Sequence, residues 1–279
     1  MKQVLAKVHV LEPVGSYLRL VLTAPEVSHD IVPGHFVGVR VGDQGSGMLL
    51  RRAFSIHQVN KGQGIEIIFA AKGQGTQWLR DVKVGDEIDI VAPLGTPFSL
   101  PTKPTGVVLV AGGYGAAPMG MLARALVAMG CQVEVVLGAA TADKLFGVDD
   151  LKRDAGQVTV TTDDGSAGVK GRVSDVLADL MARVDATVIY ACGPMPMLEA
   201  VARIATEHGA TSQCAVEESM ACGIGVCMTC VLPVIGDDGI TRMVRSCVEG
   251  PVFDGSKVRW GDVHTVPSDV FGAPVSGGH

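Results

Sequence analysis

The sequence has few aromatic residues: only 4% of its 279 residues are Phe, Tyr or Trp, although 47% are hydrophobic. Its cores must therefore be built mainly from aliphatic side chains. Basic residues are also scarce, since 23 Lys and Arg stand against 29 Asp and Glu, which gives a net charge of −6. No long run of Lys or Arg occurs. Nucleic-acid binding is disfavoured, because neutralising phosphates requires a basic surface.

Long apolar runs are missing as well. No stretch of about 18 apolar residues exists, so the sequence predicts no membrane span. The first residues lead directly into alternating positions, without the apolar segment of a secretory signal, and we expect a cytoplasmic protein. A disulfide framework is not expected, because seven cysteines is an odd number and a chain of this length needs no such staples.

Cysteines gather near the C-terminus. Cys222, Cys227 and Cys230 follow the spacing C-x₄-C-x₂-C, and Cys247 comes after a further sixteen residues. This is the plant-type ligand spacing of a [2Fe–2S] cluster. The two glycines between Cys222 and Cys227 fit it, because residues without Cβ let a loop fold tightly around an inorganic core. The alternative is a structural zinc site, which usually has a C-x₂-C pair in each half.

The first hundred residues predict an antiparallel β-barrel. Apolar and polar residues alternate along Val4–Val10 and Leu18–Leu22, as in half-buried strands. Turns rich in Gly and Pro separate the further strand-like segments. Those segments are Phe36–Val41, Ala53–Val59, Ile65–Ala71 and Glu87–Val91, with one short helix expected at Thr76–Asp81. Such short strands with little helix are typical of a small barrel, which we place at residues 1–100.

The pattern then changes to alternating strands and helices. Val107–Ala111 and Val133–Leu137 are continuous apolar segments, as expected for strands buried on both faces. Strands are also expected at Val158–Thr162 and Thr187–Tyr190, and helices at Ala117–Met129, Val173–Ala182 and Pro194–His208. This order predicts a doubly wound parallel sheet over residues 101–210. A small cluster domain with a hairpin (Val231–Ile235 and Ile240–Val244) follows over residues 211–265, and then a flexible tail over 266–279.

Two segments of the barrel region contain candidate phosphate-binding residues. Arg51 and Arg52 are adjacent on an otherwise apolar strand, which is costly unless a guanidinium meets an anion such as a phosphate. Ser55 follows three residues later. The segment Gly73–Thr76 offers backbone N–H groups and a hydroxyl as a second phosphate cradle. The alternatives are two solvated arginines and a glycine turn capped by Thr76.

Three loops of the α/β region are further candidates. Gly112, Gly113 and Gly115 lie between a buried strand and a helix, where a pyrophosphate can approach the backbone, although a tight turn would use the same residues. Cys192 ends another strand and could line a nicotinamide pocket or be a buried structural cysteine. Asp163 also follows a strand. A carboxylate there would accept a hydrogen bond from a ribose 2′-hydroxyl and repel a 2′-phosphate, which favours NAD over NADP unless the segment is only an Asp-rich turn.

Together these motifs resemble the ferredoxin–NADP reductase superfamily. With the cysteine segment added, the chain is similar to the electron-transfer subunits of class 1B dihydroorotate dehydrogenase. The stretches that carry the resemblance are Arg51–Ile56, Gly73–Thr76, Asp163–Ser166, Glu217–Cys230 and Cys247–Phe253. Two departures stand out. Ala53 replaces a proline that is frequent in the superfamily, and Ala139–Thr141 lacks a frequent arginine.

The resemblance implies three cofactors: FAD, NAD and a [2Fe–2S] cluster. FAD would be held by Arg52, Ala53, Phe54, Ser55, Ile68, Phe69, Ala70, Gly75 and Thr76. NAD would be held by Gly112, Gly113, Gly115, Ala116, Asp163, Cys192, Gly193 and Pro194. The cluster ligands would be Cys222, Cys227, Cys230 and Cys247. No catalytic acid or base is expected in this chain.

The resemblance also implies a partner. Electrons would pass between NAD(H), FAD, the cluster and the FMN of a catalytic dihydroorotate dehydrogenase subunit in pyrimidine biosynthesis, in a heterotetramer with two copies of each chain. Other reductases of the same build are the alternative, such as the electron-input subunit of a sulfide dehydrogenase, a hydrogenase or a bifurcating ferredoxin reductase. A zinc-bearing structural module without redox activity is a third hypothesis.

Overall fold

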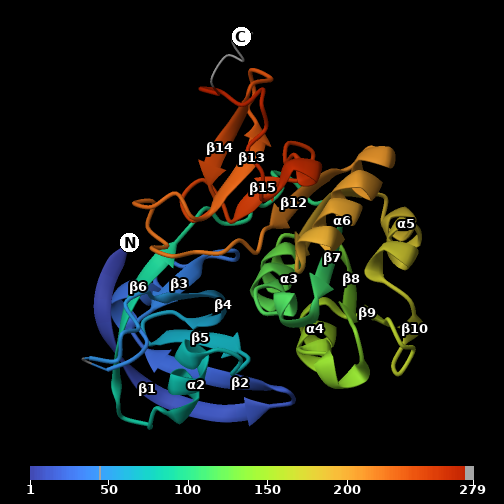
Figure 1. The fold of residues 1–279 in the computed structure, drawn as a ribbon. Helices are drawn as coiled ribbons and strands as arrows, with labels where there is room; N and C mark the ends of the chain where they lie inside the picture. The colour runs from blue at the N-terminus through green and yellow to red at the C-terminus, as the bar shows by residue number, and fades with distance from the viewer. Residues whose placement is uncertain (44, 274–279) are drawn as a thin grey trace, which may run out of the picture.

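In the computed structural model of the chain, residues 1–43 and 45–273 are described. Three parts follow one another along the chain (Figure 1): a β-barrel, an α/β part and a small segment that contains a hairpin. None of the described helices is long and apolar enough to cross a membrane.

The first part is a closed antiparallel barrel, as the sequence predicts. Its strands are β1 (Lys2–Val14), β2 (Tyr17–Thr23), β3 (Phe36–Val39), β4 (Arg52–Asn60), β5 (Gly64–Phe69) and β6 (Glu87–Leu94). They pair in the order β1-β2-β5-β4-β3-β6, and β6 closes the barrel by pairing with β1. The inward side chains are mainly aliphatic, among them Leu20, Ile56 and Ile67, because alternate residues of each strand face the core. Two short helices, α1 (Pro25–Ser28) and α2 (Gln74–Asp81), lie in the connections.

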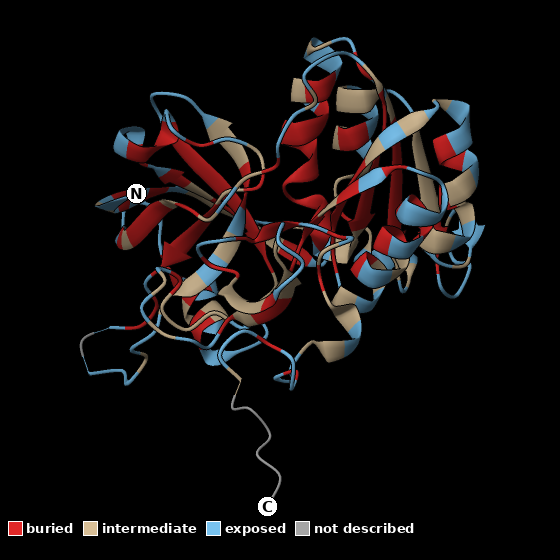
Figure 2. Ribbon diagram, turned by 90° about the horizontal axis from the view of Figure 1, so that it is seen from above, coloured by how far each residue is buried: buried red, intermediate tan, exposed pale blue. Residues whose placement is uncertain are grey.

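The second part is a seven-stranded sheet between two layers of helices. Its strands are β7 (Gly106–Gly112), β8 (Gln132–Ala139), β9 (Val158–Thr162), β10 (Val169–Lys170), β11 (Ala186–Cys192), β12 (Thr211–Ala215) and β15 (Val252–Asp254), in the order β10-β9-β8-β7-β11-β12-β15. Helices α3 (Met119–Ala128) and α4 (Val148–Ala155) pack on one face, and α5 (Val173–Arg183) and α6 (Met195–Glu207) on the other. Figure 2 shows the buried strands between them. The predicted doubly wound parallel sheet is confirmed for its central strands.

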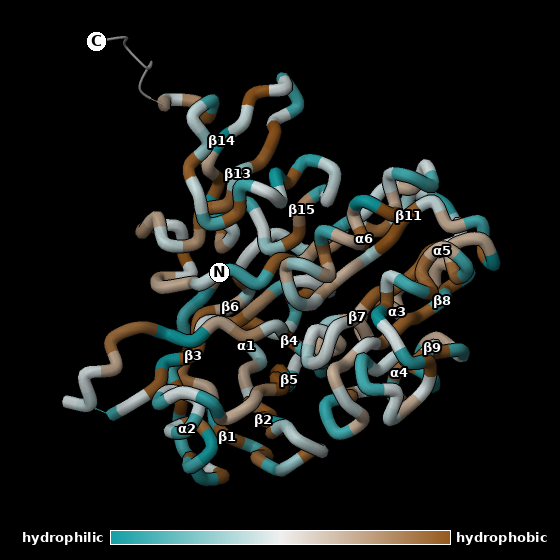
Figure 3. Tube along the Cα trace, turned by 45° about the vertical axis from the view of Figure 1, so that its right-hand side comes forward, coloured by the Kyte–Doolittle hydropathy of each residue, from teal (hydrophilic) through white to brown (hydrophobic). Residues whose placement is uncertain are grey.

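Four elements of this part were not predicted: α4, β12, β15 and the two-residue strand β10. Helix α4 is only eight residues long and lies between two glycines, so its apolar pattern is too short to identify. Strands β12 and β15 come from the part of the chain that the sequence assigned to the cluster domain. Strand β15 pairs antiparallel with β12 and makes the sheet mixed. The tube in Figure 3 shows hydrophobic residues concentrated along β8 and β11, inside the sheet.

The third part contains the predicted hairpin, formed by β13 (Val231–Ile235) and β14 (Thr241–Arg245). Residues 266–273, expected to belong to a flexible tail, lie against this hairpin. The N–H of Phe271 donates to the carbonyl oxygen of Thr241 at 2.8 Å, and Arg259 pairs with Asp269 at 2.6 Å. The rest of the expected tail, 274–279, lies outside the described residues.

Candidate functional site

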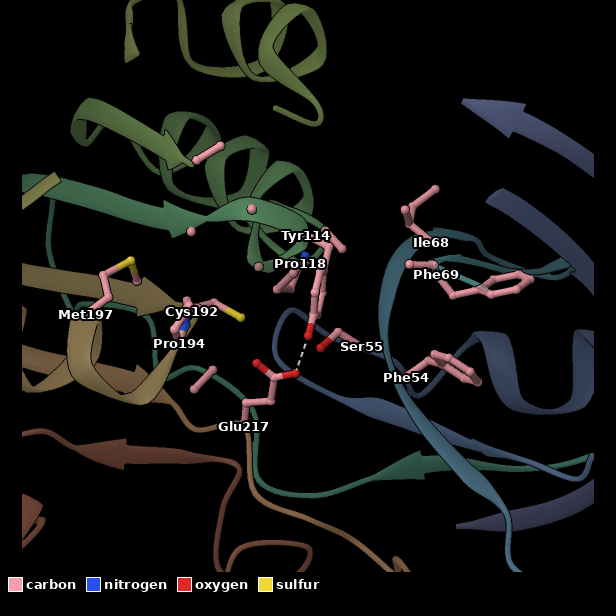
Figure 4. Close-up of a pocket in the computed structure, with 18 of the residues that line it drawn as sticks. Phe54, Ser55, Ile68, Phe69, Tyr114, Pro118, Cys192, Pro194, Met197 and Glu217 are labelled. Carbon is pink, nitrogen blue, oxygen red and sulfur yellow. Dashed lines mark hydrogen bonds between the residues drawn. The ribbon is translucent and has the colours of Figure 1, made fainter. Parts of the chain in front are cut away.

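A cavity of about 1040 Å³ lies between the barrel and the α/β sheet. In Figure 4, Ser55, Ile68 and Phe69 approach it from the barrel, while Tyr114 and Cys192 approach it from the sheet. Its lining includes the predicted residues Arg52, Ala53, Phe54, Ser55, Ile68, Phe69, Ala70, Gly75, Thr76, Gly112, Gly113, Gly115, Asp163, Cys192, Gly193 and Pro194. Ala116 is different, because its side chain is buried in the core below the glycine loop.

The two adjacent arginines have different surroundings. The guanidinium of Arg51 donates to the carboxylate of Asp89 at 2.7 Å and to its backbone carbonyl at 2.8 Å. Arg52 lines the cavity, donates to the carbonyl of Leu50 at 2.7 Å, and forms no ion pair with any described carboxylate. The two arginines therefore differ. The anionic partner of Arg51 is a carboxylate of the protein itself, whereas the guanidinium of Arg52 faces the cavity and is available to a ligand.

The predicted phosphate cradle lies directly beside Arg52. A Cβ on Gly75 would lie 2.8 Å from the Nε atom of Arg52, so only glycine lets the guanidinium rest on the first turn of α2. The hydroxyl of Thr76 accepts from the N–H of Gly73 at 3.1 Å and donates to its carbonyl at 3.0 Å. Gly73 is the N-cap of α2 and Thr76 lies three residues into the helix, so the alternative interpretation of Thr76 as the N-cap is wrong; Thr76 also lines the cavity. A helix N-terminus and a free guanidinium together favour an anionic group.

The sheet side of the cavity is shaped by close approach between two loops. A Cβ on Gly115 would lie 2.3 Å from the carbonyl oxygen of Cys192, and one on Gly193 would lie 3.1 Å from the Cα of Gly112. Gly113 has φ +56° and open space where a Cβ would stand. The glycines therefore bring the ends of β7 and β11 together and leave Gly113 facing open space. Backbone at the carboxyl ends of parallel strands is where nucleotides bind in such sheets.

A hydrogen bond joins Tyr114 to Glu217 inside the cavity. The Tyr114 hydroxyl donates to Oε1 of Glu217 (Figure 4), and the Nζ of Lys72 lies 5.6 Å from the Tyr114 ring centroid. Burial raises the pKa of Tyr114, and the bond to Glu217 adds to the shift. Burial also raises the pKa of the Cys192 thiol to about 12, so Cys192 is a neutral, weakly polar wall of the cavity. Sequence reasoning singled out Cys192 but not Tyr114, because no motif marks it.

Asp163, just after β9, lines the cavity together with Arg172. The N–H of Gly171 donates to the carbonyl of Thr162 at 2.9 Å. This hydrogen bond holds the loop after β9 against the end of that strand, so the next residue, Arg172, also lies at the end of β9. The carboxylate of the neighbouring Asp164 already accepts hydrogen bonds from the N–H and the hydroxyl of Ser166, at 2.9 and 2.6 Å. Asp163 is therefore the carboxylate that remains available. Arg172 was missed because its proximity depends on this return of the chain.

The four predicted cluster ligands lie in two pairs, and the described residues contain no group of three or more Cys, His, Asp or Glu side chains already arranged to hold a metal ion. The sulfur atoms of Cys222 and Cys227 are 3.3 Å apart, and the Cys227 N–H donates to the Cys222 sulfur at 3.4 Å. Cys230 and Cys247 are buried in one small hydrophobic group. Hydrogen bonds from Thr229 lower the pKa of Cys227 to about 6, whereas burial and the neighbouring Cys230 raise that of Cys247 to about 12. Backbone N–H groups directed at sulfur are typical of iron–sulfur sites.

The cluster loop is supported by charged and glycine residues. Gly225 has φ +81°, and its carbonyl accepts from Arg245 at 2.8 Å. Arg245 in turn pairs with Glu249 at 3.0 Å. The hydroxyl of Ser246 donates to the carbonyl of Cys230 at 2.8 Å, which links the Cys247 segment to the loop. The four cysteines are thus held without help from a disulfide.

A few side chains lie between Cys222 and the large cavity. Phe36, Ala53 and Met220 line both the large cavity and a small pocket against Cys222 and Gly223. The residues present suit the implied groups in their chemistry: two pairs of cysteines, an arginine beside a helix N-terminus, and a cavity of about 1040 Å³. Short separation through packed side chains suits electron transfer between such groups.

Comparisons with known proteins agree with this arrangement. The family model for the iron–sulfur cluster binding domain of dihydroorotate dehydrogenase B matches residues 217–259, and the oxidoreductase NAD-binding domain matches residues 109–203. The dihydroorotate dehydrogenase B (NAD(+)) electron transfer subunit of Desulforamulus reducens is 35% identical over 91% of this chain and 95% of its own. That of Shouchella clausii is 39% identical over 86% and 91%.

The chain belongs to this family. It is an electron-transfer subunit with an NAD-binding domain and an iron–sulfur domain, which confirms the family resemblance. Among solved structures, a chain of an NADH-dependent reduced ferredoxin–NADP oxidoreductase, studied for flavin-based electron bifurcation, is 30% identical. It covers 94% of this chain and 92% of its own, with a TM-score of 0.80.

Proposed function

We propose that this dihydroorotate dehydrogenase B electron-transfer subunit carries electrons between NAD(H), FAD and a [2Fe–2S] cluster, and exchanges them with the FMN of a catalytic subunit. The proposal rests on one observation: Phe36, Ala53 and Met220 line both the large cavity and the small pocket beside Cys222, so the two proposed cofactor sites are neighbours. When bound, the flavin would accept a hydride and release electrons singly, which the nicotinamide and the cluster cannot do for one another.

The residues of the chain would then hold and orient the cofactors. Arg52 and the first turn of α2 would bind the flavin phosphates, and Ser55 would lie near the flavin ring. The glycine loop after β7 would bind the NAD pyrophosphate, with Asp163 on the adenosine ribose. Cys192 and Pro194 would form the wall on which the nicotinamide rests. Cys222, Cys227, Cys230 and Cys247 would hold the cluster.

The partner surface is proposed to surround the cluster loop. Val226 and Met228 are exposed at 80% and 59%, and Ile224 and Val248 are also exposed beside them. Such a group of exposed apolar side chains next to an electron exit fits a subunit interface. We propose that the FMN-bearing catalytic subunit docks here, in a complex with two copies of each chain in the cytoplasm.

The test begins with anaerobically purified protein. Flavin, iron and acid-labile sulfide should be present together, and NADH should bleach the visible spectrum. Cys227→Ser should remove the cluster and keep the flavin, so NADH would still reduce a two-electron dye but no longer the catalytic subunit. Folded protein without iron would contradict the proposal, as would partner reduction that survives in Cys227→Ser.

A second candidate is the electron-input subunit of a bifurcating complex, favoured by the TM-score of 0.80 to the NADH-dependent reduced ferredoxin–NADP oxidoreductase chain. The cofactors would be the same and only the partner would differ. Co-purification from the native host separates the two. An FMN-containing dihydroorotate-oxidising chain supports the first candidate, and a larger flavoprotein that reduces ferredoxin supports the second.

A further inference from the structure

The proposed function requires a route for one proton, and the following inference rests on that function. Oxidation of NADH gives NAD⁺, two electrons and one proton. A [2Fe–2S] centre carries electrons one at a time and carries no proton. Each turnover must therefore move one proton between the cavity and the solvent, outward when NADH is oxidised and inward when NAD⁺ is reduced.

Most ionisable groups that line the cavity are poorly suited to this task. Glu217 is engaged by the Tyr114 hydroxyl. The Cys192 thiol stays protonated, because burial raises its pKa to about 12. Asp163 lines the cavity just after β9, where we propose that the adenosine ribose binds. The guanidinium of Arg52 is a hydrogen-bond donor without an acceptor atom, which suits it to holding a phosphate.

Glu218 has the required surroundings. It lines the cavity, its side chain is only 4% exposed, and its Oε1 atom is buried without a hydrogen-bond partner among the described residues. A buried carboxyl oxygen left without a partner is costly and is expected to have a role. Burial raises the pKa of Glu218, while His264 and the N–H of Ser219, the groups that face it, oppose the shift.

His264 connects Glu218 to the surface. Its Nδ1 atom lies 3.9 Å from the other carboxyl oxygen of Glu218, and its side chain is 73% exposed. One bridging water or a small rotation closes such a gap. The backbone of His264 has φ +65°, a conformation that few residues other than glycine adopt. An imidazole has two ring nitrogens, so it can accept a proton at one and release a proton to solvent from the other.

We propose that Glu218 and His264 form a proton relay between the cavity and the solvent. With flavin bound, Glu218 would accept the one proton that the reduced flavin gives up from its N–H group as the electrons leave, so that an O–H bond forms on Glu218 as that N–H bond breaks. That proton then moves to Nδ1 of His264, and the proton on Nε2 leaves to water. The electrons travel separately, so each pair of electrons is balanced by one proton, and the reverse sequence serves NAD⁺ reduction.

The test uses the complete, cofactor-loaded chain and two carboxylate variants. Glu218→Gln keeps the shape of the side chain and removes its proton-carrying capacity. Glu134→Gln is the matched control, because Glu134 is also buried with an unpartnered oxygen but does not line the cavity. Oxidised-minus-reduced infrared spectra should contain a carboxylic acid C=O signal that shifts in D₂O. The signal should vanish in Glu218→Gln and persist in Glu134→Gln.

Rapid kinetics give the second readout. Reoxidation of the reduced flavin by a one-electron acceptor should slow about 10²-fold in Glu218→Gln, the scale of a lost acid–base group, while hydride transfer from NADH keeps its rate. His264→Ala should slow the same phase, and added imidazole should restore it. A carboxyl signal that survives in Glu218→Gln, or unchanged reoxidation in both variants, overturns the relay. Wild-type protein lacking flavin or iron would instead overturn the proposed function itself.

Discussion

The two adjacent arginines of β4 make the sharpest prediction, because replacing each by alanine should change a different property. Arg52 has no described carboxylate partner and rests on the first turn of α2, so Arg52→Ala should weaken FAD binding. Hydrogen bonds to a charged group contribute about 1.5–3 kcal/mol, which corresponds to an affinity loss of about 10- to 150-fold. The unfolding temperature of the flavin-free protein should stay nearly unchanged.

Arg51→Ala should show the opposite pattern. Its ion pair with Asp89 is mostly buried, with side-chain exposures of 22% and 14%. Removing the guanidinium leaves the carboxylate of Asp89 with the amide of Gln3, which donates to it at 2.9 and 3.1 Å. We therefore expect a loss of about 1–3 kcal/mol in the free energy of unfolding. Intrinsic flavin affinity at a temperature where the variant is folded should remain within about threefold.

The measurements are a fluorescence titration of flavin-free protein with FAD and thermal unfolding of the same preparation. Asp89→Asn is the control for the ion pair and should resemble Arg51→Ala in both measurements. The assignment of roles would be refuted if Arg52→Ala lowered the unfolding temperature of the flavin-free protein by several degrees while binding FAD normally. Equal losses of affinity in both arginine variants would refute it as well.

Three further predictions concern the cavity. Asp163→Arg should raise the NADPH-to-NADH ratio of kcat/KM by tenfold or more, since a 2′-phosphate would gain a cation in place of a carboxylate, and an unchanged ratio in steady-state assays would remove Asp163 from the ribose site. Gly115→Ala should cost about 1–3 kcal/mol of stability, because its Cβ would lie 2.3 Å from a backbone oxygen of Cys192, and denaturant unfolding that matches wild type would contradict this. The raised pKa of Glu218 means that its contribution to stability is complete below the pKa of the unfolded chain, near 4.5, and is lost as pH rises through the folded value. Unfolding free energies measured across mildly acidic pH should therefore fall less with rising pH in Glu218→Gln than in wild type, and parallel curves would exclude this contribution.

The sequence predicts features that depend on local pattern. Alternation over short segments predicts the barrel strands, and the spacing of Cys222, Cys227 and Cys230 predicts the ligand loop, since three ligands lie within nine residues. The glycine loop after β7 is also visible, because a buried strand and a helix flank it. In each case neighbouring residues carry the information, and the structure confirms the barrel strands.

What the sequence does not predict depends on contacts between distant segments. Arg172 reaches the cavity only because the chain returns to the end of β9. Glu217 and Glu218 face the cavity because β12 joins the large sheet, far from the residues that they meet. His264 meets Glu218 across 45 intervening residues, a pairing that no local periodicity indicates. The sequence assigned β12 and β15 to the cluster domain for the same reason. Both strands are short, and the whole cysteine segment separates them along the chain although they pair with each other.

The pairing of β12 with β15 has a mechanical consequence. Ala215 and Val252 are direct neighbours in the sheet, so the cysteine-bearing segment leaves and re-enters the same rigid platform at adjacent points. It is an inserted loop and cannot behave as a swinging arm on a tether. The distance over which electrons tunnel should then be the same in every molecule and at every stage of turnover, so the pace of transfer is set by driving force and not by domain diffusion.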